Sequence, residues 1–261
     1  TIWTKAFGST GSDQCSSVIE CSDGGLLFVG YTPNLLSGYW DVYCIRTDLQ
    51  GDTIWTRTFN NKNSNSGFSA VQTMDGGYLI ASITSTYGVS NTKDGFIIKL
   101  NELGDTVWTK TIDKGMDDWV SCIVELSGGD FVVSGRTNSL GYGGYDTFLA
   151  RYDSNGNEIW FKNYGGTADD SGGKIIVSND SGIVFSGTTY SFGHGAGDLY
   201  LIKTNINGDT LWTKTYGGSN DDMGGGSIYQ TNDNGFITGG ITNSYGNGVE
   251  MYLVKTRADG F

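Results

Sequence analysis

Proline and histidine are almost missing from this chain, which has one of each in 261 residues. Long apolar runs are missing as well: no segment approaches the roughly 18 apolar residues of a membrane-spanning helix, so we expect no membrane insertion. Basic residues number 16 against 28 acidic ones, and the net charge of −12 would repel a phosphate backbone. Nucleic acid is therefore not an expected partner. The first residues also lack the charged head and apolar stretch of an export signal, so we expect any such signal to lie outside this chain.

Cysteine is scarce too, and no two cysteines have the Cys-x-x-Cys spacing that zinc sites commonly use. The four cysteines are Cys15, Cys21, Cys44 and Cys122. Cys15 and Cys21 would be about 20 Å apart on an extended strand, which is beyond the reach of a disulfide. We therefore expect buried, unpaired thiols that act as small apolar side chains.

Glycine and tryptophan, in contrast, are plentiful and regularly placed. The stretch GDTLWTKTYGGSNDD at residues 208–222 has relatives throughout the chain, and its tryptophan recurs at intervals of 52 or 53 residues. The five copies are Trp3, Trp55, Trp108, Trp160 and Trp212. The repeat divides the chain into units 1–52, 53–105, 106–157, 158–209 and 210–261. Because these units leave no residue over, the sequence predicts one domain built from five repeats.

Each repeat contains four short segments with the alternating pattern or β-rich composition of strands. In the last unit they are TLWTKTY, GGSIYQT, FITGGIT and EMYLVKT. Asp, Asn and Gly residues such as SDGG at 22–25 and NDNG at 232–235 lie between the second and third segments, where tight turns need positive φ. No convincing helical stripe is present. The pattern predicts an all-β, five-bladed β-propeller of four-stranded antiparallel blades, whereas the alternative, a parallel β-helix, would have a shorter period.

The segment after each Asp-rich loop is rich in glycine and serine, which suits the crowded strand next to the propeller axis. We call it strand A and the tryptophan segment strand D. Residues 1–7 would then supply the outer strand of the last blade by pairing with residues 251–256, and so close the ring. The long connections run from D to A and from B to C. They are predicted to emerge on one face, which we call the long-loop face.

The recurring strings GDTLWTKTYGGSNDD and DLYLIKT resemble the bacterial and archaeal SBBP-type β-propeller repeats, which are common in secreted and cell-surface proteins, especially of the Bacteroidetes. The resemblance covers all five units. It is weakest in the second unit, where NNKNSNS replaces the loop sequence GGSNDD. It implies an exported propeller, extracellular or at the cell surface, and assigns no activity.

Acidic residues recur where the long loops enter strand A. The set is Asp13, Asn65, Asp118, Asp170 and Asp222. These side chains could form a ring that holds Ca²⁺ at the mouth of the axial channel, or each could accept backbone N–H groups in its own turn. We favour the turn role, because a residue that recurs in nearly every blade is best explained by a structural role common to all blades. Strand C starts with a similar set, Asp41, Asp94, Asp146, Asp198 and Glu250, for which we again favour a structural role. No other cofactor is expected.

A binding function is better sought where the repeats differ. Trp119 follows Asp118 at a position where the other units have Gln, Ser, Ser and Met, and it could either stack on a sugar or plug the channel. Trp40 and Tyr145 share one position in the B–C loops, and Arg136 ends strand B on the same face. Aromatic side chains beside Asp and Arg suit carbohydrate recognition. The only histidine, His194, lies in a glycine-rich loop and is predicted to be solvated rather than catalytic.

The sequence thus favours a non-catalytic binding module, secreted or on the cell surface, that recognises a glycan or a cell-surface protein through the long-loop face. An alternative is a structural spacer within a larger surface or filament protein. A glycoside hydrolase is disfavoured, because that chemistry needs two carboxylates in different surroundings and the carboxylates here are near-identical copies.

Overall fold

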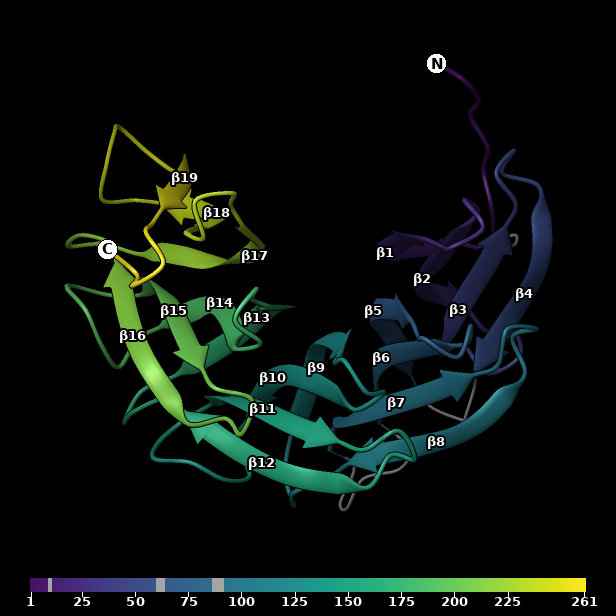
Figure 1. Ribbon diagram of the computed structural model, residues 1–261, viewed down its shortest axis with the longest axis horizontal. Coiled ribbons are helices and arrows are strands. Elements are labelled where there is room, and N and C mark those ends of the chain that lie inside the picture. Colours follow the sequence, from purple (N-terminus) through teal and green to yellow (C-terminus); the bar gives the residue numbers. More distant parts are fainter. Residues whose placement is uncertain (9–10, 60–63, 86–91) are drawn as a thin grey trace. The chain divides into compact units, whose positions relative to one another are not determined.

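The computed structural model describes residues 1–8, 11–59, 64–85 and 92–261, and none of these residues is helical. The described part accordingly contains no apolar helix of membrane-spanning length. Its strands form antiparallel sheets, four with four strands and one with three. Figure 1 labels these strands in chain order. The all-β prediction is confirmed.

Each four-stranded sheet takes three strands from one repeat and its fourth strand from the start of the next. The first sheet consists of β1 (Gln14–Glu20), β2 (Leu26–Pro33), β3 (Trp40–Thr47) and β4 (Thr53–Phe59). The second consists of β5 (Asn65–Gln72), β6 (Tyr78–Thr84), β7 (Asp94–Leu100) and β8 (Thr106–Ile112). The third consists of β9 (Asp118–Glu125), β10 (Phe131–Thr137), β11 (Asp146–Tyr152) and β12 (Glu158–Tyr164). The fourth consists of β13 (Asp170–Val177), β14 (Ile183–Thr189), β15 (Asp198–Thr204) and β16 (Thr210–Tyr216). The fifth is β17 (Asp222–Gln230), β18 (Phe236–Thr242), β19 (Glu250–Lys255).

Two compact units make up the structure. The first consists of Thr1–Gly129 with Ser154–Gly156 and holds β1 to β9. The second consists of Asp130–Asp153 with Asn157–Phe261 and holds β10 to β19. Within each unit, buried apolar side chains of consecutive sheets form common clusters, which include Val42 and Ile80 in the first unit and Leu201 and Phe236 in the second. Burial of these faces is what drives consecutive sheets together.

The Gly- and Ser-rich strands are innermost within each unit, as predicted. In the first unit β5 lies beside both β1 and β9, and in the second β13 lies beside β17. Glycine permits this approach: a side-chain carbon on Gly172 would lie 2.5 Å from the carbonyl oxygen of Gly135. The tight A–B turns likewise have the positive φ that their composition predicted, with φ of 63° at Ser181 and 61° at Asn234.

The repeated tryptophan joins consecutive sheets. Trp55 in β4 meets the ring of Tyr78 edge-on in the next sheet, with 5.8 Å between ring centroids, and donates its indole N–H to the carbonyl of Glu102 at 3.3 Å. Its flat face lies on Gly104, which has φ of 78°. Glycine is therefore required at this position for two reasons: its backbone has a positive φ, and a side chain would overlap the indole.

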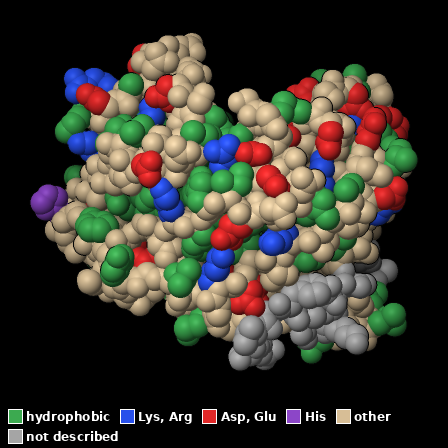
Figure 2. All heavy atoms as spheres, turned by 60° about the horizontal axis from the view of Figure 1, so that its bottom comes forward, with side chains coloured by type: hydrophobic (Ala, Val, Ile, Leu, Met, Phe, Trp, Pro, Cys, Tyr) green, Lys and Arg blue, Asp and Glu red, His purple; other side chains and the backbone are tan. Residues whose placement is uncertain are grey.

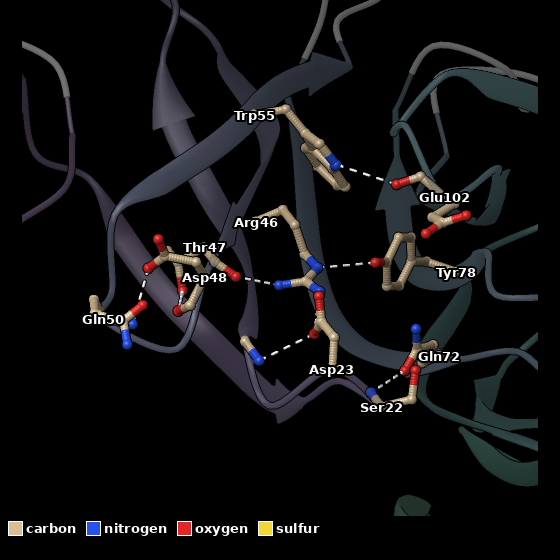
Figure 3. Close-up of polar contacts among 11 residues, drawn as sticks. Ser22, Asp23, Arg46, Thr47, Asp48, Gln50, Trp55, Gln72, Tyr78 and Glu102 are labelled. Atoms are coloured by element: carbon tan, nitrogen blue, oxygen red, sulfur yellow. Dashed lines mark hydrogen bonds and ion pairs between the residues drawn. The ribbon is translucent and has the colours of Figure 1, made fainter.

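A buried cation in strand C contacts the A–B turn of its own sheet, a feature that the sequence analysis did not find. Arg46, 4% exposed, donates through Nη2 to Asp23 Oδ1 at 2.5 Å and through Nε to the hydroxyl of Tyr78 in the next sheet at 2.9 Å (Figure 3). The equivalent ion pairs in the other sheets are Lys99–Asp75, Arg151–Asp130, Lys203–Asp180 and Lys255–Asp233. On the face shown in Figure 2, acidic and basic side chains are correspondingly interspersed.

The predicted closing strand is not formed in this structure. Residues 1–8 have no strand assignment, and β19 has no fourth strand beside it among the described residues. Met251 and Leu253 on β19 are 95% and 69% exposed, whereas their equivalents in β15, Leu199 and Leu201, are fully buried in a cluster with side chains of the following sheet. Within its unit, β19 has no following sheet, and its apolar side chains lack that cover.

Residues 1–7 instead lie on the first sheet. Trp3 packs on Gly51, Lys5 forms an ion pair with Asp52, and the rings of Phe7 and Phe28 are 5.5 Å apart. The outer strands make the same contacts with the sheet that follows each of them. Trp55 packs on Gly104 and Arg57 pairs with Asp105, and likewise Trp160 packs on Gly208 and Lys162 pairs with Asp209. The segment thus lies where the outer strand of a preceding sheet would lie.

Three of the four cysteines behave as predicted, and all four are unpaired. Cys21, Cys44 and Cys122 are buried, and burial raises the pKa of Cys44 to about 12. Cys15 is exposed, so the prediction of burial is wrong at this position. The physical reason is its place on β1, because no sheet precedes β1 within its unit to cover that face.

Candidate functional site

The D–A and B–C loops meet at the same end of the sheets, as predicted. In the second unit, the backbone N–H of Tyr145 donates to Asp169 Oδ1 at 2.9 Å, and the N–H of Tyr190 donates to the carbonyl of Asp169 at 3.0 Å. In the first unit, Lys93 N–H donates to Asp117 Oδ1 at 2.9 Å. The long-loop face is therefore built from paired loops, although residues 9–10, 60–63 and 86–91 of these loops lie outside the described part of the chain.

A cavity of about 220 Å³ opens on the long-loop face of the second unit. Its lining comes from three consecutive repeats and consists of Arg136, Tyr145, Asp169, Ser171, Thr188, Tyr190 and Met223. The cavity brings together two predicted site residues, Arg136 and Tyr145. The others were missed. Tyr190 could have been found by the same rule, because it stands where the other repeats have Pro33, Ser85, Asn138 and Asn243.

The lining offers aromatic surface together with charges of both signs. The guanidinium of Arg136 lies 4.7 Å from the ring centroid of Tyr145, a cation–π arrangement that fixes both side chains. Asp169 is exposed and Tyr190 is 44% exposed. Burial, with the nearby carboxylates of Asp221 and Asp169, raises the pKa of Tyr190, so its hydroxyl remains protonated at neutral pH. The cavity can therefore donate hydrogen bonds from Arg136 and Tyr190 and accept them at Asp169.

The remaining predicted aromatic residues lie in the first unit and are not part of this cavity. Trp119 is half-buried at the start of β9, and the Lys93 ammonium lies 4.5 Å from the centroid of its ring. Lys93 thus occupies a face on which a sugar would have to stack. Trp40 is half-buried and meets Tyr31 edge-on at 5.1 Å. The lining of this cavity therefore includes neither Trp40 nor Trp119.

The carboxylates at the start of strand A accept backbone N–H groups in their own turns. Asp118 accepts from Lys114 at 2.6 Å, Asp170 from Gly166 at 2.8 Å and Asp222 from Gly218 at 2.6 Å, in each case the residue four positions earlier. This is the turn role that the sequence analysis favoured. Asn65 is buried and Asp13 is half-buried. Whether the five positions share an ion on an axis stays a prediction.

Carboxylates at the start of strand C have shifted acidities. Burial, followed by the charges of Asp113 and Asp118, raises the pKa of Asp94 from 3.8 to about 7. Burial also raises the pKa values of Asp146 and Asp198, although the hydrogen bonds that these carboxylates accept from backbone N–H groups act in the opposite direction and lower them. One oxygen from each of Asp94, Asp113 and Asp118 lies within 4.8 Å of the others, so this triad could hold a metal ion.

His194 is exposed in its loop, as predicted, and its backbone N–H donates to Asp198 Oδ2 at 2.6 Å. The backbone rather than the imidazole makes this contact. The position therefore orders the loop around Asp198 and gives no support to acid–base chemistry.

No family model matches the chain. Among curated proteins, the regulatory protein FlaEY of Caulobacter vibrioides is 25% identical in an alignment of 175 residues that covers 58% of this chain and 18% of that protein. The chain therefore spans less than a fifth of the length of this relative.

Solved structures resemble the chain in fold. A protein of unknown function from Bacteroides caccae aligns with a TM-score of 0.60 and 12% identity, over 95% of this chain and 79% of that one. The β-propeller domain of the Trilobed protease from Pyrococcus furiosus, which has an open velcro topology, aligns with a TM-score of 0.51 and 12% identity, over 98% of this chain and 70% of that one. Together with the repeated four-stranded sheets, these likenesses show a β-propeller repeat protein.

Proposed function

We propose that the protein is a non-catalytic binding module that recognises a carbohydrate in the cavity between Arg136, Tyr145 and Tyr190. The supporting observation is the convergence of two tyrosines, an arginine and an exposed carboxylate, Asp169, on one cavity of about 220 Å³. This volume is below that of typical drug-sized pockets, about 300–1,000 Å³, and suits a single sugar ring with its neighbours outside.

Each lining group has a role in this proposal. The exposed ring of Tyr190 supplies an apolar face for the C–H groups of a sugar, while Arg136 and the Tyr190 hydroxyl donate to sugar oxygens. Asp169 accepts from sugar hydroxyls through its carboxylate. The cation–π contact holds Tyr145 and Arg136 in place before the ligand arrives, so binding orders fewer side chains.

Binding to a glycan array, followed by calorimetry with the strongest ligand, tests the proposal. Tyr190→Ala and Arg136→Ala should each weaken binding at least tenfold. Tyr142→Ala should leave it unchanged, because Tyr142 is a 78% exposed tyrosine that lies in the same B–C loop as Tyr145 but does not line the cavity. An array without binding contradicts the function, and binding that survives both cavity substitutions contradicts the site.

We further propose that the protein acts outside the cell or at its surface and belongs with the SBBP-type repeats, on the strength of the recurring GDTLWTKTYGGSNDD pattern. Surface labelling of intact cells with a membrane-impermeant reagent tests the location. Labelling of the protein only after lysis contradicts it.

We also propose that the ring is five-bladed and closes when residues 1–7 become the fourth strand beside β19. This proposal is supported by the contacts of Trp3 and Lys5 on the first sheet, which repeat those of an outer strand, and by the uncovered Met251 and Leu253. Residues 1–261 would then form one domain. Closure would bury the exposed edge of β19.

A single substitution tests closure, because the exposed thiol of Cys15 serves as a natural probe. At the other junctions the residue equivalent to Cys15 contacts the residue equivalent to Met251 in the preceding sheet, as Val120 contacts Gly95 and Gly224 contacts Leu199. In Met251→Cys, mild oxidation should therefore form a disulfide to Cys15 within one molecule. Tyr252→Cys, on the opposite face of β19, should not form one. A disulfide-linked dimer, or no disulfide, contradicts closure within one chain.

A further inference from the structure

The loop ends of consecutive sheets are joined by pairs of carboxylates. Strand C of one sheet and strand A of the next each start with an aspartate, and the two approach each other across the first residue of the D–A loop. The described pairs are Asp94–Asp118, Asp146–Asp170 and Asp198–Asp222. A side-chain carbon on Gly165 would lie 1.9 Å from Asp146 Oδ1 and 2.7 Å from Asp170 Oδ2. The sequence analysis treated these aspartates as two separate sets, whereas the structure brings them together.

One oxygen of the strand C carboxylate lacks a partner at two of these junctions. Asp146 and Asp198 are at most 1% exposed, and their Oδ2 atoms accept the N–H groups of Tyr142 and His194. Within the described part of the chain, Oδ1 of each has no hydrogen-bond partner. Oδ1 of Asp198 instead faces the carboxylate of Asp222 across Gly217. A buried anionic oxygen beside a second carboxylate is costly unless a positive charge lies between them.

The remaining junction has an additional carboxylate. Asp113 stands at the position of Gly165 and Gly217, and one oxygen from each of Asp94, Asp113 and Asp118 lies within 4.8 Å of the others. Asp94 is fully buried, and Thr92 Oγ1 lies 3.4 Å from both of its oxygens, longer than an ordinary O–H···O bond. At the other two junctions the strand C aspartate has an oxygen without a hydrogen-bond partner. At this junction the oxygens of Asp94 have only a weak hydrogen bond and lie near the carboxylates of Asp113 and Asp118.

We propose that these junctions bind a divalent cation of the calcium class, and that Asp113 makes the Asp94–Asp118 junction the tightest site. Ca²⁺ takes oxygen ligands at about 2.3–2.6 Å, so two ligands on opposite sides of the ion are about 4.8 Å apart. Three carboxylate oxygens within 4.8 Å of one another are therefore close enough to bind one Ca²⁺ together. Mg²⁺, with ligands at about 2.0–2.1 Å, sets a narrower limit of about 4.2 Å between two ligands and loses its water reluctantly.

The cation would link two sheets that share no strand, because Asp94 starts β7 and Asp118 starts β9. It would add a charged contact between consecutive blades at the loop end. Calcium should therefore stabilise the fold without taking part in the carbohydrate cavity, which is lined by other residues.

Terbium luminescence, excited through the tryptophan next to Asp118, and calcium calorimetry on the full chain test the proposal. Wild-type protein should bind Tb³⁺ saturably, and Ca²⁺ should displace it better than Mg²⁺ does. Asp113→Gly, which installs the residue of the other junctions, should weaken the tight site at least tenfold while leaving the calcium-free melting temperature near that of wild type. Asp117→Asn removes the same charge beside the triad and should change binding less than threefold.

Equal calcium affinity in wild type and Asp113→Gly overturns the site, as does equal weakening by Asp117→Asn. No binding of Tb³⁺ or Ca²⁺ at millimolar concentration overturns the cation altogether. The cation proposal is also overturned if each pair of carboxylates binds a shared proton between pH 5 and 8 and calcium does not change this proton binding. A variant that does not fold is replaced by Asp94→Asn, which keeps the shape of the side chain and should also remove tight binding.

Discussion

Replacing Arg46 with methionine should destabilise the protein through the tyrosine that it leaves behind. Arg46→Met keeps most of the buried volume and removes the donor to the Tyr78 hydroxyl, and Tyr78 is only 1% exposed. An unsatisfied buried hydroxyl costs about 1–3 kcal/mol. The lost ion pair adds about 0–1 kcal/mol, because Asp23 is 58% exposed and returns to water. The expected loss of unfolding free energy is about 2–3 kcal/mol.

Urea unfolding followed by tryptophan fluorescence measures this loss, and a double-mutant cycle identifies its cause. In the Arg46→Met background, Tyr78→Phe should restore stability relative to Arg46→Met alone, with a coupling energy of about 1–2 kcal/mol. Arg257→Met is the matched control. The Arg257–Asp259 ion pair is exposed on both sides, so the change should stay within about 0.5 kcal/mol. A coupling energy of zero, or equal losses at Arg46 and Arg257, would refute the role given to the buried cation.

Three further predictions concern acid stability, the first residues and the blade junctions. The hydrogen bond from Lys203 lowers the pKa of Asp180 to about 2, so the pair stabilises the fold above about pH 4 and loses that effect as the pH falls towards 2. Lys203→Met should flatten this part of a melting-temperature profile, and Lys110→Met should not. Deleting residues 1–7 should lower the melting temperature by about 10 °C, because the packing of Trp3 and Phe7 on the first sheet, at about 2 kcal/mol for each side chain, is lost and 1 kcal/mol corresponds to about 2–4 °C. An unchanged value argues against closure. Gly165→Ala should destabilise by about 1–3 kcal/mol in urea unfolding, since its methyl group would overlap a buried carboxylate.

The strands and turns were predictable because their signals are local and repeated. Alternation in segments such as TLWTKTY and the Asp-Gly turns recur in register, so each copy supports the others. The inner position of strand A followed from its small residues. Exposure of Cys15 was not predictable in the same way, because burial at that position depends on which sheet precedes β1 rather than on its own sequence neighbourhood.

Features formed between repeats were harder to predict. The cation at the position of Arg46 recurs in every repeat, yet its purpose depends on the hairpin turn that packs beside it. The junction between Asp94 and Asp118 likewise joins residues that a single repeat never places together. Only part of the cavity was anticipated: Arg136 and Tyr145 deviate visibly from the repeat, whereas the contribution of Asp169 depends on how one loop folds over another.

The placement of residues 1–7 on the first sheet has a consequence for the order of folding during synthesis. This segment leaves the ribosome long before β19 does, and by then Trp3, Lys5 and Phe7 can already be held by the first sheet. The last three strands would then meet a template that is already extended and in register. Under the proposed closure, such a chain would not have to search for the partner of β19, and the exposed edge of β19 would be covered soon after that strand is made.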